Sequence, residues 1–120
     1  MPDILCLVSD ITETGKEVIF EHQGRRSYLL LLRHGGEILA YHNVCPHQGR
    51  NLNFAPDRFL FDPAGRLVCP HHGAMFEVAD GLCVQGPCQG AALRKVQVRI
   101  EGDAVVLADP GLAATGLAAN

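Results

Sequence analysis

The sequence has 120 residues, a formal net charge of −3 and five cysteines. One domain is expected at this length, and the weak acidity gives no reason to expect nucleic acid, which binds to basic faces. No apolar run approaches the roughly 18 residues that span a bilayer, and residues 1–5 lack the basic start of a signal peptide. We therefore expect a soluble, cytoplasmic protein with no membrane contact.

The first half of the chain predicts β-structure. Short apolar runs bounded by polar residues or glycine are expected as strands at residues 4–8, 16–21, 27–33 and 37–43. The leucine run at 29–32 is also compatible with a buried helical turn, but its shortness and the following Gly35-Gly36 favour a strand and a hairpin. Phe20, Tyr28 and the leucine run are expected in the core.

The middle of the chain, about residues 44–89, differs in composition. Prolines and glycines are scattered through it, and both residues break helices and long strands. A long irregular segment is expected in a compact domain only where function holds it in place. Short strands are still expected at 66–68, 75–78 and 82–84. Three phenylalanines lie between Cys45 and Cys69 and should pack this segment and exclude water from its interior: Phe54, Phe59 and Phe61.

The β pattern resumes after Gly90. Val96, Val98 and Ile100 alternate with polar residues, which is typical of one half-buried strand. Residues 104–107 form a return strand beyond a turn at 102–103. Residues 109–120 are expected as a loose terminus with a short helix as the alternative. The whole pattern predicts a single all-β domain, with a basal part from residues 1–43 and 90–108 and a smaller subdomain at about 44–89.

Two stretches of this smaller subdomain pair thiols with imidazoles. They are Cys45-Pro46-His47 and Cys69-Pro70-His71-His72. Such ligands suit zinc or an iron–sulfur cluster and suit magnesium or calcium poorly. An odd cysteine count without a signal peptide argues against a disulfide framework. Metal binding, catalysis and packing are therefore the roles to weigh for each cysteine.

The spacing C-x-H followed by C-x-x-H resembles the Rieske pattern, in which two Cys hold one iron of a [2Fe–2S] cluster and two His hold the other. Residues 45–49 and 69–73 look like the two cluster-binding loops of that family, and Gly86-Pro87 looks like its covering third loop. The resemblance spans essentially the whole chain. It implies the Rieske fold of stacked antiparallel sheets with a small cluster-binding subdomain, and one [2Fe–2S] cluster. The implied ligands are Cys45, His47, Cys69 and His72.

Residues beside these ligands depart from one branch of the family. Respiratory Rieske proteins carry a further Cys in each loop, and the two form a disulfide; the corresponding positions here are Arg50 and His71. Those proteins also place Ser and Tyr hydroxyls where this chain has Ala74 and Phe76. Without these donors the implied reduction potential lies toward the low end of the Rieske range, roughly −150 mV. The chain therefore resembles the low-potential Rieske ferredoxins.

The remaining glycines and cysteines near the loops have other expected roles. Gly49 and Gly73 permit positive φ, which lets backbone N–H groups turn toward the cluster sulfides. Cys83 and Cys88 flank Gly86-Pro87; a disulfide between them is conceivable, but reduced, packed thiols are favoured in an intracellular protein. Cys6 lies in an apolar run and is expected in the core.

The function implied is electron transfer rather than catalysis. A ferredoxin of this kind contacts a reductase and a terminal oxygenase or other oxidoreductase transiently near its His ligands, with Gln48 and Arg50 as contact residues. The alternatives are a non-catalytic small Rieske subunit of a larger oxidoreductase, and a structural or redox-sensing zinc module. Zinc fingers favour C-x-x-C followed by H-x-x-x-H, which is not the spacing here. A self-contained Rieske oxygenase is excluded because 120 residues leave no room for its mononuclear iron domain.

Overall fold

The computed structural model describes residues 4–22, 24–46 and 49–108, so the predicted tail at 109–120 lies outside the described residues. The described part consists of antiparallel strands and one short 3-10 helix, η1 (Val8–Asp10), which confirms the all-β prediction. None of its helices is long and apolar enough to cross a membrane.

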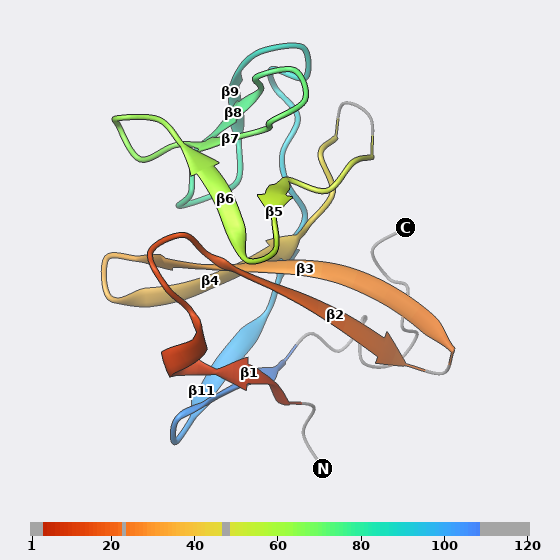
Figure 1. Cartoon of the computed structure of the whole chain (residues 1–120), viewed down its shortest axis with the longest axis vertical. Coiled ribbons are helices and arrows are strands. Elements are labelled where there is room, and N and C mark those ends of the chain that lie inside the picture. The colour runs from red at the N-terminus through yellow and green to blue at the C-terminus, as the bar shows by residue number, and fades with distance from the viewer. Residues whose placement is uncertain (1–3, 23, 47–48, 109–120) are drawn as a thin grey trace.

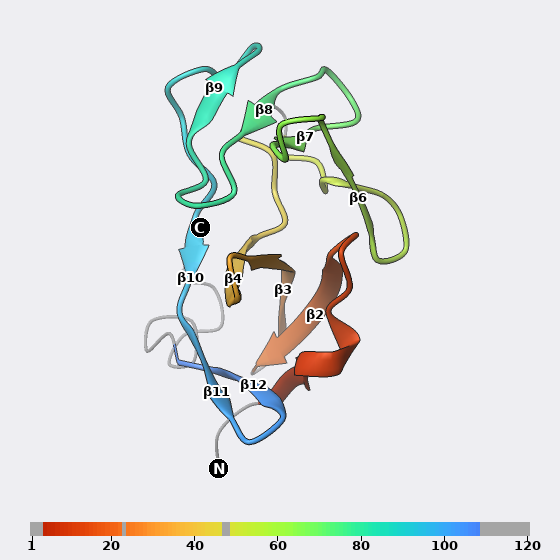
Figure 2. The same cartoon turned by 90° about the vertical axis from the view of Figure 1, so that its left-hand side faces the viewer.

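Three sheets are stacked along the long axis of the molecule (Figures 1 and 2). The terminal sheet contains β1 (Ile4–Leu7), β12 (Ala104–Leu107) and β11 (Val98–Glu101) in that order. The central sheet has the order β10 (Lys95–Val96), β4 (Glu37–His42), β3 (Arg25–His34) and β2 (Lys16–His22). The loop sheet pairs its strands in chain order: β5 (Asn53–Ala55), β6 (Arg58–Phe61), β7 (Leu67–Val68), β8 (Met75–Phe76) and β9 (Cys83–Gln85).

The leucine run of β3 is buried on both faces of the central sheet. Successive side chains of a strand point to opposite faces. Leu29 and Leu31 pack into the core shared with the terminal sheet, whereas Leu30 and Leu32 pack into the core shared with the loop sheet. A strand between two cores needs apolar residues at every position, which explains why this run does not alternate.

Local turns follow the sequence prediction. Strands β3 and β4 pair from Leu29–His42 to His34–Glu37 and are joined by Gly35 and Gly36, both at positive φ. This is the two-residue hairpin that consecutive glycines favour.

The single strand predicted over residues 96–101 is wrong. Strand β10 pairs with β4 in the central sheet, whereas β11 pairs with β12 in the terminal sheet, so the chain changes sheets at Gln97. Val96 is buried in the central sheet, but Ile100 is 47% exposed on an outer face. The alternation therefore extends across two strands in different environments.

Strands β5 and β6 of the loop sheet were not predicted, because they are short and lie in a segment with scattered prolines and glycines. Two predicted core positions are also wrong: Phe54 is 55% exposed and Tyr28 is 36% exposed, because their side chains point away from the cores. Phe59 is buried as predicted. Phe61 and Cys6 are partly buried against the two cores.

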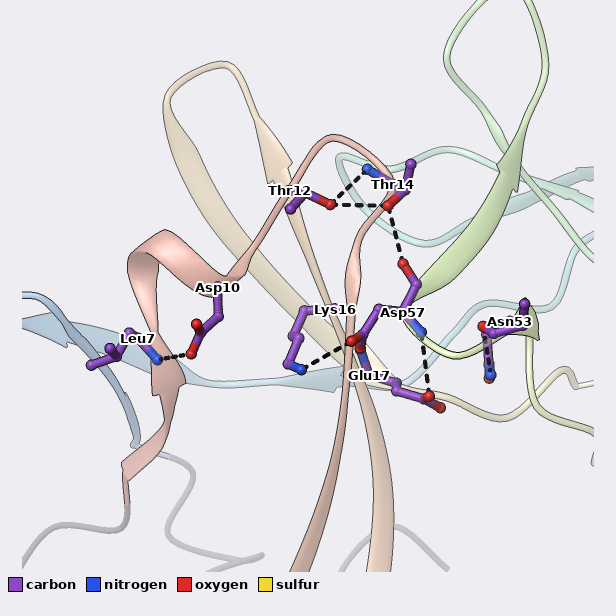
Figure 3. A network of polar contacts seen from close by, with 9 residues as sticks. Leu7, Asp10, Thr12, Thr14, Lys16, Glu17, Asn53 and Asp57 are labelled. Carbon is purple, nitrogen blue, oxygen red and sulfur yellow. Dashed lines mark hydrogen bonds and ion pairs between the residues drawn. The ribbon is translucent and has the colours of Figure 1, made fainter.

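A polar network ties the loop sheet to the central sheet (Figure 3). Asp57, in the turn between β5 and β6, accepts hydrogen bonds from Lys16 Nζ at 3.1 Å and from the Glu17 N–H at 3.0 Å. Its carbonyl oxygen accepts from the Thr14 hydroxyl at 3.0 Å. The Asp57 backbone has a φ of 58°, a left-handed conformation that Asp tolerates better than most residues. The turn is thus fixed to the start of β2.

Candidate metal centre

The first predicted ligand loop starts at Cys45, whose side chain is buried. The Cys45 N–H donates to the Arg50 carbonyl at 2.8 Å, and the Gly49 N–H donates to the Cys45 carbonyl at 2.8 Å. His47 and Gln48 lie outside the described residues. Arg50 is exposed, as expected of a contact residue.

The second ligand loop closes with the same two hydrogen bonds. The Cys69 N–H donates to the Ala74 carbonyl at 2.7 Å, and the Gly73 N–H donates to the Cys69 carbonyl at 3.0 Å. In both loops the bonded partners lie five and four residues after the cysteine. Gly49 and Gly73 have positive φ values of 69° and 76°, which a residue with a Cβ adopts only with strain. Their N–H groups close the loops, so the N–H donors expected to face the cluster sulfides are not those of the two glycines.

Asn43 holds the base of the first loop, a role that sequence analysis missed. Its side chain is buried; Oδ1 accepts a hydrogen bond from the Leu52 N–H at 2.7 Å, and Nδ2 donates to Asn53 Oδ1 at 2.9 Å. The Asn43 N–H donates to the Tyr28 carbonyl of β3 at 2.7 Å. Residues 43 and 52 bracket the loop, so this amide joins its two ends. The one sequence signal was an Asn at the end of an apolar strand.

The third loop lies directly against the second. Gly86 has a φ of 105°, and a Cβ at this position would come within 2.7 Å of Ala74 Cα. Both the backbone conformation and the space therefore require glycine here. The predicted covering loop at Gly86-Pro87 contacts the ligand loop at residues 69–74.

Cys83 and Cys88 bring two further thiols to this region. Both are free, and their sulfurs are 3.3 Å apart. The Cys83 thiol also donates to the Gln85 carbonyl oxygen at 3.3 Å. Burial raises the pKa of Cys88 to about 12, helped by hydrogen bonding to Cys83 and by the nearness of Cys83 and Cys45. Cys88 is therefore a protonated neighbour of a predicted ligand.

The described residues fit a mixed Cys/His cluster site in their chemistry. Cys45 and Cys69, each 2% exposed, belong to the same buried core, while His71 and His72 are exposed. Buried thiolates with imidazoles toward the surface suit the two irons of a [2Fe–2S] cluster held by different ligands. Among the residues described, no three His, Cys, Asp or Glu side chains converge closely enough to hold a metal ion. The set Cys45, His47, Cys69 and His72 therefore stays a prediction.

Comparison with known proteins identifies similar chains. The family profile described as Rieske [2Fe-2S] domain matches residues 3–108. The cytochrome b6-f complex iron-sulfur subunit of Chlorobaculum thiosulfatiphilum is 31% identical over 93 residues, which are 78% of this chain and 46% of that protein. The ferredoxin component of the alkene monooxygenase system of Xanthobacter autotrophicus is 27% identical over 105 residues, 86% of this chain and 77% of that one. Among solved structures, a Sphingomonas yanoikuyae B1 ferredoxin superposes with a TM-score of 0.68 at 25% identity, covering 89% of this chain and 97% of that chain.

Proposed function

The chain belongs to the family of Rieske [2Fe–2S] domains, and on that premise we propose that it is the ferredoxin component of an oxygenase system. Family membership means that it binds one [2Fe–2S] cluster and is an electron-transfer protein. The cluster supplies one-electron redox chemistry when bound. We further propose that it works in the cytoplasm, whose ordinary reducing balance favours the dithiol form of pairs such as Cys83 and Cys88.

The pair of identically closed loops carries the proposal. Each loop presents one buried cysteine and fixes it with two backbone hydrogen bonds. We assign Cys45 and Cys69 as the thiolate ligands, and His47 and His72 as the imidazole ligands. The cysteines exclude water on the core side, whereas the exposed His72 offers a short route to a docked partner.

The ferredoxin role is supported by one relative that matches over most of both chains. The Xanthobacter relative is named as a component of an alkene monooxygenase system. We propose the same kind of partners for this chain: a reductase that supplies electrons and an oxygenase that accepts them, each bound transiently.

The second candidate is the iron–sulfur subunit of a larger electron-transfer complex. It is suggested by the Chlorobaculum relative, of which this chain spans less than half. The residues after the second loop favour the ferredoxin. Ala74 and Phe76 are fully buried and carry no hydroxyl to donate to a cluster or ligand sulfur, so a low potential is expected.

Voltammetry of the purified protein tests the choice between these candidates. A ferredoxin should show a midpoint of roughly −150 mV, whereas a value near +300 mV would favour the respiratory-type subunit. Reduction by a flavin-dependent reductase and reoxidation by an oxygenase should follow second-order kinetics, because the contacts are transient. The rates should fall with added salt, because charge steers the encounter.

Ligand variants test the site itself. His72→Ala should abolish the rhombic EPR signal of the reduced cluster and the equal content of iron and sulfide. The matched variant His71→Ala should keep both, because the C-x-x-H spacing assigns His72 as the ligand and leaves His71 as its neighbour. Retention of the cluster in His72→Ala and its loss in His71→Ala would overturn the assignment. A colourless protein with stoichiometric zinc would overturn the cluster itself.

A further inference from the structure

Cys83 and Cys88 form a close pair of thiols that the predicted ligand set does not use. Their sulfurs are 3.3 Å apart, whereas a disulfide bond is about 2.05 Å long, so each sulfur would move by less than about 1 Å to bond. Cys83 is buried and Cys88 is partly buried, so the pair lies just beneath the surface.

The backbone already holds both cysteines in position. The Cys83 N–H donates to the Ala91 carbonyl at 2.8 Å, and the Gly90 N–H donates to the Cys83 carbonyl at 3.0 Å. The Ala91 N–H donates to the Cys88 carbonyl at 2.9 Å. The loop is therefore closed by hydrogen bonds before any covalent link is made, and rotation of the two side chains is the main movement needed.

We propose that Cys83 and Cys88 are a reversible dithiol–disulfide pair, oxidised by a low-molecular-weight disulfide. Formation of the Cys83–Cys88 bond shifts the reduction potential of the nearby cluster. One cysteine sulfur attacks the small disulfide, forms a mixed disulfide and releases one small thiol. The second cysteine sulfur then displaces the other small thiol and closes the Cys83–Cys88 bond. Two protein thiols are oxidised by two electrons, one small disulfide is reduced to two thiols, and the two protons pass to those thiols.

The location of the pair connects it to the predicted ligands. Gly86, between the two cysteines, lies against Ala74 of the second ligand loop. Cys88 packs against the core that contains Cys45 and Cys69. Oxidation links Cys83 to Cys88 and fixes the covering loop against the second ligand loop. The hydrogen bonding and solvent exposure of a cluster help to set its potential, so fixing the covering loop should shift the potential; this part rests on the proposed function.

Burial affects how fast the pair reacts rather than where its equilibrium lies. Exchange requires a small disulfide to reach a cysteine sulfur, and attack is slow here because Cys83 is buried and Cys88 is partly buried. The pair is therefore suited to a sustained change in the thiol–disulfide balance and not to a brief one. Its oxidation has to be measured after long equilibration.

The test uses the cluster-loaded protein, equilibrated without oxygen in mixtures of reduced and oxidised glutathione. After free thiols are alkylated, peptide mass spectrometry should find Cys83 linked to Cys88, with the linked fraction rising with the oxidised share while the visible absorption of the cluster persists. Absence of the linked peptide at every ratio, or its presence only in protein that has lost the cluster, would overturn the proposal.

Single variants separate the pair from other thiols and from the proposed function. Cys83→Ser and Cys88→Ser should each abolish the link, whereas Cys6→Ser, which removes a partly buried thiol from the terminal sheet, should keep it. Voltammetry should show a shifted midpoint for the oxidised wild type, and the same midpoint in reduced and in oxidised glutathione for Cys83→Ser. A link without this shift would overturn the effect on the cluster. A protein that binds zinc but still forms the link would contradict the proposed function and not the dithiol pair.

Discussion

At the scale of single residues, the site depends on positions where the backbone leaves no choice. Gly86 combines a positive φ with close contact to Ala74, and Gly49 and Gly73 combine positive φ with the hydrogen bonds that close the ligand loops. Gly49 and Gly73 follow the ligand pairs, so their role can be predicted from the sequence. The contact between Gly86 and Ala74 joins residues of different loops, and no local pattern reveals it.

Gly86→Ala should be strongly destabilising. The left-handed φ and the approach of the new Cβ to Ala74 backbone should together cost about 2–4 kcal/mol. Gly102→Ala is the matched control, because Gly102 also has a positive φ but has open space around it; it should cost about 1 kcal/mol. Urea unfolding followed by cluster absorption measures both variants. Equal midpoints would show that the contact with Ala74 is not constraining.

Asn43→Ala should loosen the first ligand loop. It leaves the buried Leu52 N–H without its acceptor, which costs about 1–3 kcal/mol, and the cluster should be lost faster on exposure to a chelator. Asn53→Ala removes the second partner of Asn43 and a 3.3 Å hydrogen bond to the Ala55 carbonyl but leaves the Leu52 N–H bonded, so it should have the smaller effect. If the two variants release iron at the same rate, Asn43 does not act through Leu52.

At the scale of elements, the turn between β5 and β6 fixes the loop sheet to β2. Burial alone would raise the pKa of Asp57, but hydrogen bonds from the Glu17 N–H and from Lys16, together with the charge of Lys16, outweigh it and lower the pKa. A lowered carboxyl pKa contributes stability above the unfolded value of about 3.9, and this contribution is lost as the pH falls through the folded pKa.

Asp57→Asn should therefore lower stability by about 1 kcal/mol at neutral pH, since Asn keeps the left-handed backbone but loses the ion pair. The difference in urea midpoint between wild type and variant should stay constant from pH 8 to pH 5 and narrow below about pH 4. Glu101→Gln removes an exposed pair with Arg99 and should change the midpoint little at any pH. A difference for Asp57→Asn that grows in acid would contradict the assignment of the lowered pKa.

At the scale of the whole molecule, side-chain contacts between the sheets hold the layers together. Tyr41 of β4 is fully buried, and its hydroxyl donates to the Val78 carbonyl at 2.6 Å. This bond joins the central sheet to the segment between β8 and β9, which leads to the third loop.

Tyr41→Phe should lower the free energy of unfolding by about 1–3 kcal/mol, because the buried Val78 carbonyl loses its donor. Tyr28→Phe removes a hydroxyl from an exposed side chain and should leave the urea midpoint within about 0.5 kcal/mol of the wild type. Equal losses in the two variants would show that the hydroxyl bond of Tyr41 does not couple the layers.

The sequence predicted what depends on local pattern. Strands β2, β3 and β4, the hairpin at Gly35-Gly36 and the all-β class follow from apolar runs and glycine positions, and the family follows from two short ligand stretches. Three other features depend on which distant strand lies alongside. They are the change of sheet at Gln97, the exposure of Phe54 and the hydrogen bonds of the Asn43 side chain. Such contacts have no local signature, so they needed the structure.

The pairing of β1 with β12 has a consequence for the order in which the chain folds. The loop sheet pairs strands that are neighbours in sequence, whereas Ile4 pairs with Val106 across almost the whole described chain. Local pairs form early and long-range pairs form late. During synthesis β1 emerges before the other described strands, so it waits longest for its partner, with its hydrogen-bonding edge open to other chains. Aggregation of newly made protein should therefore begin at β1, at the opposite end of the molecule from the ligand loops.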